Sequence, residues 1–127
     1  MPRQATNSTH LAAPVGPFSH AVHAGELVFL SGQVAQDPVS GKLIQGAVRQ
    51  QTQQIFANIG VLLKDLGLTL DDVVKVNVFL TSMRDFGEMN TVYGEHFTQP
   101  YPARTTVAVS ELPLGAKVEM EMVARRA

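Results

Sequence analysis

The spacing of apolar residues changes several times along this chain, and each change marks a predicted element. Residues 26–31 form a short apolar run that ends at Gly32, which is typical of a buried strand. Over residues 47–66, apolar positions recur at spacings of three and four, which predicts an amphipathic helix closed by Gly67. Residues 73–81 are rich in β-branched side chains, which predicts a second strand.

A second helix and two further strands are predicted in the C-terminal half. Ser82 or Asp85 is placed to cap this helix. Its candidate apolar stripe consists of Phe86, Met89 or Asn90, Tyr93 and Phe97. Residues 99–102 are expected to be extended, because a residue before proline avoids helical geometry. Strand-like runs follow at residues 104–109 and 117–122.

Strict alternation assigns faces within the predicted strands. In residues 117–122 the expected core face consists of Val118, Met120 and Met122, and Glu119 and Glu121 share the accessible face. In residues 73–81 one face consists of Val74, Val76, Val78 and Leu80, and the other of Lys75, Asn77 and Phe79. The combined polar face is too mixed to be a core, so it is a candidate subunit interface.

The order of the elements is strands, helix, strand, helix, strands. This order predicts a small α/β or α+β sheet with both helices on one face. With 127 residues, the chain is expected to form a single domain over residues 1–127, in which the polar residues 1–13 are loosely ordered. Such a short chain has a limited core, so association with copies of itself would bury further apolar surface.

Composition excludes several classes of function. The formal net charge is −1 and no basic run occurs, which argues against nucleic acid as the main partner. The chain has no cysteine, which excludes disulfides, thiolate metal ligands and a cysteine nucleophile. We see no secretory signal in the first twenty residues and no apolar stretch that could span a bilayer. A cytoplasmic protein without a membrane partner is expected.

Two charged residues in the last strands are candidates for chemistry. Arg104 carries a planar fork of donors that matches a carboxylate, although a surface pairing with Glu119 or Glu121 is the plainer interpretation. A glutamate near a cleft can orient water and transfer a proton, but it can equally be an ordinary solvated strand residue. Strand parity does not choose between Glu119 and Glu121.

Histidine and serine patterns favour no other chemistry. The four histidines are His10, His20, His23 and His96. They form no HExxH pattern, and His20 and His23 are too close for a helical zinc pair, so no metal is expected. A structural or solvent-exposed role is the better interpretation of His20. Neither Ser19 nor Ser31 lies in a GxSxG elbow, so a serine nucleophile is not favoured.

Several motifs together resemble the Rid/YjgF family of reactive intermediate deaminases, also labelled endoribonuclease L-PSP. Residues 102–107 (PARTTV) and 118–120 (VEM) are similar to its signature, and residues 16–21 (GPFSHA) resemble its GPYSQA segment. Residues 31–33 (SGQ) and 71–75 (DDVVK) also match. The resemblance extends in order and register over residues 14–124.

The resemblance implies a fold, an assembly and an activity. The fold is α+β and chorismate-mutase-like, with a roughly six-stranded mixed sheet and two helices packed on one face. The assembly is a homotrimer with clefts between subunits. The activity is hydrolysis of reactive 2-imino acids and enamines, such as 2-iminobutanoate and 2-iminopropanoate, to 2-oxo acids and ammonia. The ligand is thus a small 2-imino or 2-oxo acid, and no cofactor or metal is needed.

The family register implies roles for individual residues. Arg104 and Glu119, rather than Glu121, occupy the catalytic positions. The implied substrate-binding positions are Phe18, Gly32, Asn90 and Thr106. Without the motif, Gly32 reads equally well as a strand-ending glycine and Asn90 as a helix-surface amide. Phe18 replaces a common tyrosine and loses its hydroxyl, and Thr106 replaces a frequent cysteine whose main chain is the expected contact.

Two other functions remain open at this stage. Because Phe18 and Thr106 alter the edge of the cleft, a related hydrolase acting on an aminoacrylate, a carbamate or an aminomuconate is one alternative. A ribonuclease, translation inhibitor or chaperone-like trimer is the other. The near-neutral charge and the lack of basic stripes with aromatic residues disfavour RNA.

Overall fold

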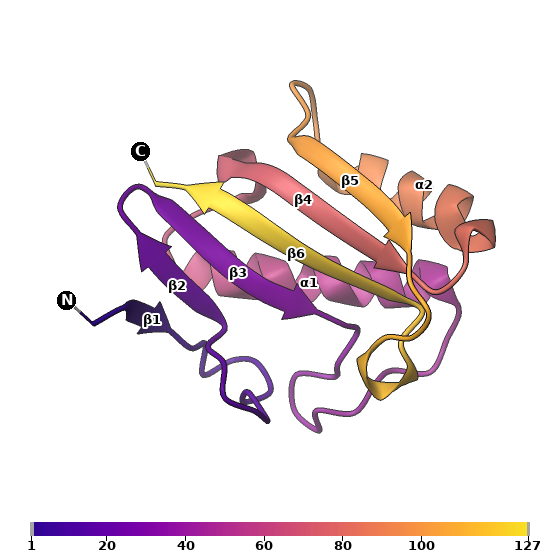
Figure 1. The fold of residues 1–127 in the computed structure, drawn as a ribbon, viewed down its shortest axis with the longest axis horizontal. Coiled ribbons are helices and arrows are strands. Elements are labelled where there is room, and N and C mark those ends of the chain that lie inside the picture. Colours follow the sequence, from indigo (N-terminus) through magenta and orange to yellow (C-terminus); the bar gives the residue numbers. More distant parts are fainter. Residues whose placement is uncertain (1, 127) are drawn as a thin grey trace.

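A computed structural model describes residues 2–126 as one six-stranded sheet with two helices (Figure 1). The elements are β1 (Gln4–Thr6), β2 (Ala21–Ala24), β3 (Leu27–Gln33), α1 (Val48–Asp65), β4 (Val73–Leu80), α2 (Phe86–His96), β5 (Ala103–Ala108) and β6 (Val118–Arg125). Short 3₁₀ turns lie at Leu70–Asp72, Met83–Asp85 and Pro113–Gly115. Neither α-helix in the described chain combines the length and the apolar character that crossing a membrane requires.

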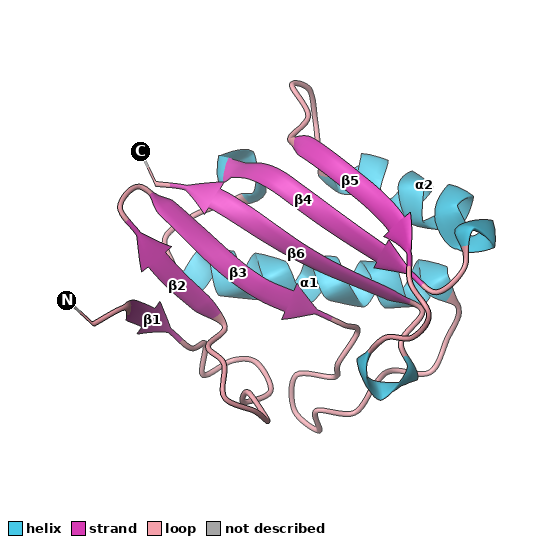
Figure 2. Cartoon of the chain, in the orientation of Figure 1, coloured by secondary structure: helices cyan, strands magenta, loops and turns pink. Residues whose placement is uncertain are grey.

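The strand order across the sheet is β1-β2-β3-β6-β4-β5. β4 and β5 are parallel and are joined through α2, whereas the other neighbouring strands are antiparallel. Both helices lie on the same side of the sheet (Figure 2). The predicted α+β class, the mixed six-stranded sheet and the placement of the helices are therefore confirmed.

The core fills the space between the sheet and α1. The inward side chains of the helix are fully buried, including Ile55, Ile59, Leu62 and Leu63. They face a sheet surface that contains Val76, Val78, Leu80, Met120 and Met122. The predicted end of the helix is confirmed, because Gly67 adopts the left-handed conformation with φ of 74° and its N–H bonds to the carbonyl of Lys64.

The predicted faces are correct for β6 and only partly correct for β4. Val76 is fully buried, but Val74 is 43% exposed, so the prediction that these two residues share a face is wrong. Val73 is buried instead, and the pairing with β6 shifts register between Val73 and Lys75. Such an irregularity inserts a residue and breaks the alternation on which parity depends.

The N-terminal segment differs from the loosely ordered stretch expected over residues 1–13. β1 extends the sheet by pairing with β2. Ser8 is buried, and its hydroxyl donates to Asp65 at the end of α1. The Ser8 N–H also donates to Nδ1 of His20, whose Nε2 lies 3.0 Å from the carbonyl oxygen of Ala12. Polar contacts order this segment, and its low apolar content therefore gave no sign of that order.

Neither helix covers the opposite face of the sheet. It carries the predicted polar set, in which Asn77 donates to Glu121 and Lys75 donates to Thr105, each over 3.0 Å. Phe29 from β3 lies on the same face and is 45% exposed. A hollow of about 360 Å³ lies among these side chains. The interpretation of this face as a subunit interface stays a prediction.

Candidate functional site

Arg104 lies near the start of β5, the edge strand that follows α2. It pairs with Val76 of β4, so its side chain lies on the helix-covered face. Its Nη1 donates to Oδ1 of Asn90 over 2.7 Å. The guanidinium carbon lies 4.6 Å from the ring centroid of Tyr93 and 5.6 Å from that of Phe86. One amide and two aromatic rings therefore orient the guanidinium.

The guanidinium borders a cavity of about 350 Å³. The lining residues are Asn90, Tyr93, Gly94, Tyr101, Pro102 and Arg104. No Asp or Glu within residues 2–126 forms an ion pair with Arg104. Its remaining N–H donors are thus available to an anion, and a planar carboxylate fits their geometry.

Two buried hydroxyls belong to the same region of the fold. The Thr106 hydroxyl, two residues beyond Arg104 on the same face, has no hydrogen-bond partner within the described residues. The Tyr93 hydroxyl is also buried and unpartnered there. Burial raises the pKa of Tyr93, and the nearby positive charge of Arg104 opposes that rise. Sequence reasoning assigned Tyr93 to the apolar stripe of α2 and missed its contact with the guanidinium.

Glu119 lies on β6, on the face that the helices leave uncovered. It pairs with Phe79 of β4. A Cβ atom built on Gly32 of β3 would lie only 2.5 Å from Oε2 of Glu119 and 3.0 Å from its Cδ. Gly32 therefore permits the carboxyl group to lie against the backbone of β3. Burial raises the pKa of Glu119, and the negative charge of Glu121 raises it further.

Glu119 forms part of the wall of a second cavity, of about 320 Å³. This cavity brings together three of the predicted residues, Phe18, Gly32 and Glu119. The other lining residues are Val15, Ser31, Val34, Gln36, Pro113 and Leu114. The Ser31 hydroxyl donates a hydrogen bond to the carbonyl of Ser19, so this hydroxyl links two segments of the backbone. Phe18 is 48% exposed at this cavity and supplies a ring without a hydroxyl.

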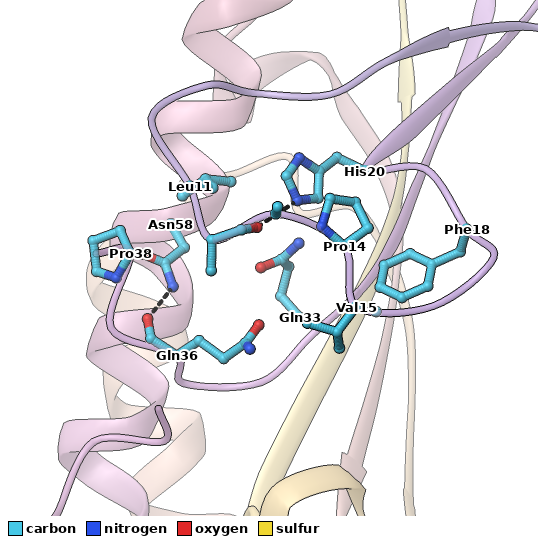
Figure 3. Close-up of a pocket in the computed structure, with 12 residues that line it drawn as sticks. Leu11, Pro14, Val15, Phe18, His20, Gln33, Gln36, Pro38 and Asn58 are labelled. Carbon is cyan, nitrogen blue, oxygen red and sulfur yellow. Dashed lines mark hydrogen bonds between the residues drawn. The ribbon is translucent and has the colours of Figure 1, made fainter. Parts of the chain in front are cut away.

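A much smaller cavity adjoins the Glu119 cavity, and the two share Val15, Phe18, Gly32 and Gln36 as lining residues. Figure 3 shows this smaller cavity, with Phe18 and His20 among its lining side chains. Its volume is about 30 Å³, enough for a water molecule. Asn58 of α1 donates to the carbonyl of Gln36 at its wall. The buried His20 ring also lines it, and its two ring nitrogens are engaged as described above. His20 therefore has a structural role.

The predicted site residues form two groups on opposite faces of the sheet. Arg104, Asn90 and Thr106 lie on the helix side, near the β5 edge. Phe18, Gly32 and Glu119 lie together at the other cavity. A single copy of the chain does not present Arg104 and Glu119 to the same small ligand, because the sheet lies between them. Residues 2–126 contain no group of three or more His, Asp or Glu side chains arranged to hold a metal ion.

Comparisons with known proteins agree with this fold. The model of the family described as endoribonuclease L-PSP matches residues 9–126. The chain is 43% identical over 117 residues to a 2-iminobutanoate/2-iminopropanoate deaminase of Dermatophagoides farinae, covering 91% of each chain. It is 42% identical over 111 residues to a RutC family protein of Pyrococcus abyssi, covering 87% of each. The crystal structure of RidA from a Psychrobacter species superposes with a TM-score of 0.91 at 40% identity, covering 97% of this chain and 99% of that one.

Proposed function

This chain belongs to the endoribonuclease L-PSP family, also called Rid/YjgF, and on that premise we propose that it hydrolyses reactive 2-imino acids and their enamine tautomers. The products are 2-oxo acids and ammonia, and the proposed substrates are 2-iminobutanoate and 2-iminopropanoate. One observation carries the proposal most directly. Arg104 is half-buried and oriented at a cavity without an acidic partner in the described chain, and every substrate in this class has a carboxylate beside the reacting carbon.

Arg104 is proposed to bind the substrate carboxylate. Its Asn90 bond and its contact with the Tyr93 ring fix the guanidinium before a ligand arrives. Such preorganisation reduces the entropy lost on binding. The guanidinium stays charged at every relevant pH, so the carboxylate can bind whether the imine nitrogen is protonated or neutral.

Glu119 is proposed to transfer the protons. Hydrolysis adds the oxygen of water to C2, which gives a tetrahedral carbinolamine, and then breaks the C2–N bond. Starting from the protonated imine, the carboxylate accepts a proton from the attacking water as the O–C2 bond forms, and the carboxyl group then donates this proton to the amino nitrogen. As the C2–N bond breaks, the carboxylate accepts the proton of the C2 hydroxyl, so that ammonia leaves, the carbonyl forms, and the last proton passes to ammonia or solvent. A raised pKa suits this exchange, because the group then both accepts and donates a proton closer to neutral pH.

The complete site is proposed to lie between copies of the chain. Arg104 and Glu119 lie on opposite faces of one sheet, so a ligand that touches both must receive them from different copies. The uncovered sheet face, with the exposed Phe29 and the polar Lys75–Asn77–Glu121 group, is the proposed contact surface. Association as a homotrimer through this face would give equivalent clefts, in line with cyclic symmetry.

The direct test measures 2-oxo acid and ammonia from imines generated in place by an amino-acid oxidase, corrected for spontaneous hydrolysis. We expect acceleration by the parent, and a loss of at least about a hundredfold in kcat/KM for Arg104→Ala and Glu119→Gln, as expected when a binding or proton-transfer group is removed. The exposed Arg84 and Glu111 provide matched controls, as Arg84→Ala and Glu111→Gln, which keep parental rates. An Arg104→Ala variant as fast as the parent contradicts the assignment.

A second candidate is a related hydrolase for another small acid, such as an aminoacrylate, a carbamate or an aminomuconate. It is favoured by one feature of the Glu119 cavity, the phenyl ring of Phe18, which offers no hydrogen bond to a polar substrate. A panel of these substrates separates the two candidates. Faster turnover of short aliphatic imines than of any other panel member rejects the second.

A further inference from the structure

Three large apolar side chains gather at the mouth of the Glu119 cavity. We call Val15, Phe18 and Leu114 the apolar rim. They are 89%, 48% and 57% exposed, respectively, and all three line that cavity. Exposed apolar residues that are scattered singly need no explanation, whereas several around one cavity mark a binding surface. The rim comes from two segments far apart in sequence, one before β2 and one before β6.

Leu114 holds its position in an unfavourable backbone conformation. Its φ of 61° and ψ of 15° lie in the left-handed region, which glycine and asparagine tolerate far better than leucine. Leu114 is also the only non-glycine residue in residues 2–126 with a positive φ. Strain of this kind is typical of functional segments, where a particular side chain is kept despite its cost.

The chemistry of the cavity wall limits what the rim can contact. Glu119 is the only ionisable side chain among the residues that line this cavity. Within one copy, no Lys or Arg lines this cavity, and the Arg104 that another copy is proposed to supply binds the carboxylate next to C2, so no cation is left for an acidic side chain of the substrate. Apolar surface at the mouth favours the burial of methylene and methyl groups. A substrate whose C2 lies beside Glu119 would therefore place an aliphatic side chain against the rim.

We propose that the apolar rim determines which side chain the substrate carries, with Leu114 as its specificity-determining residue. The inference rests on the proposed function, since it places the reacting carbon beside Glu119. Aliphatic 2-imino acids of three to five carbons are the preferred class, over those with hydroxylated or acidic side chains. Each added methylene is expected to improve binding about fourfold, the factor that follows from burying one such group.

The test uses binding of the product class, so that it does not depend on turnover. Calorimetry measures the Kd of pyruvate, 2-oxobutanoate, 2-oxopentanoate and hydroxypyruvate, the last being similar in size to 2-oxobutanoate but polar. The parent is expected to bind about fourfold more tightly with each methylene and to bind hydroxypyruvate more weakly than 2-oxobutanoate. Leu114→Asn suits the left-handed backbone and should reduce the gain to less than about twofold per methylene.

Two variants serve as controls. Leu114→Met keeps an apolar side chain at this position and should retain the fourfold steps in Kd. Met83 is 50% exposed in a turn that lines none of these cavities, so Met83→Ala should behave as the parent. The assembly state of each variant is measured by light scattering.

The outcomes separate the rim from the proposed reaction. Loss of the steps in Leu114→Asn with assembly unchanged supports the inference. Four results overturn the inference: equal Kd values across the series in the parent, steps that survive in Leu114→Asn, no measurable binding, or a changed assembly state of Leu114→Asn. If the steps are present but no imine is hydrolysed, the proposed reaction fails, and the rim stands only as a surface that selects the side chain of a bound 2-oxo acid. If imines are hydrolysed without any dependence on chain length, the rim fails alone.

Discussion

Replacing Gly32 with alanine moves the Glu119 carboxyl group without removing it. The new Cβ would lie 2.5 Å from Oε2, whereas ordinary contact begins near 3.4 Å, so the oxygen must move by roughly 0.9 Å. The clash involves the end of a flexible side chain, and Gly32 does not have a left-handed φ. We therefore expect Gly32→Ala to fold normally, with little change in its free energy of unfolding.

The effect on catalysis should be much larger than the effect on stability. A misplacement of about 1 Å can cost a hundredfold in rate, because a proton-transfer group acts only within hydrogen-bond reach. Imine hydrolysis by Gly32→Ala is thus expected to fall about a hundredfold in kcat/KM. Gly60 of α1 provides the matched control, since a Cβ there meets nothing within 4 Å, and Gly60→Ala should keep full activity.

A double-mutant cycle shows whether the loss acts through the carboxyl group. If it does, adding Gly32→Ala to a Glu119→Gln protein changes the residual rate by less than about twofold, because effects on one group are not additive. A full hundredfold further loss in the Glu119→Gln background would refute this reasoning. It would mean that the new methyl group blocks the ligand itself.

Three further predictions follow from local contacts. Burial raises the pKa of Glu119 in the folded state, so the fold favours the protonated carboxyl, and this contribution to stability is lost as pH rises through the raised pKa. Glutamine does not titrate, so the free energy of unfolding of Glu119→Gln, measured in urea, should increase relative to that of the parent between pH 4 and pH 7. The hydrogen bond from the Ser8 hydroxyl lowers the pKa of Asp65, so the ionised carboxylate stabilises the fold above its ordinary pKa of 3.8, and this stabilisation is lost on acidification. Asp65→Asn should therefore be less stable than the parent at pH 7 and equally stable in acid, and equal stability at pH 7 contradicts the contact. Asn90→Ala removes a 2.7 Å bond from Arg104 and should weaken 2-oxo acid binding about tenfold in calorimetry, whereas an unchanged Kd would show that Asn90 does not position Arg104.

Local patterns predicted both helices and the strands β3, β4, β5 and β6, but they missed β1, β2 and the pairing register at the start of β4. The three-and-four spacing that ends at Gly67 gave α1 to within a residue at each end. Val74 was misplaced because the irregular pairing beside Val73 depends on the neighbouring strand β6, not on the strand's own residues. The ordered path of the N-terminal segment depends on Ser8 bonding to Asp65, a contact between residues 57 positions apart that no local pattern carries.

The sequence proposed residues for the candidate site, but it could not give their geometry. Parity placed Glu119 and Glu121 on one face, and the structure distinguishes them, because Glu119 lies against Gly32 whereas Glu121 accepts a hydrogen bond from Asn77. The relative faces of Arg104 and Glu119 could not be read from sequence, because β4 lies between their strands and sets both registers. Leu114 gave no signal at all, since backbone conformation is not visible in a leucine within an apolar turn.

Arg104 and Glu119 are proposed to act on one substrate from different copies of the chain. The most direct measurement mixes Arg104→Ala and Glu119→Gln proteins, each expected to be at least about a hundredfold less active than the parent, by unfolding and refolding them together. If the site lies between copies, some clefts in mixed assemblies receive both native residues, and imine hydrolysis should recover to roughly a quarter of the parental rate on random mixing of equal amounts. Assemblies shown to contain both variants that remain inactive would contradict the claim.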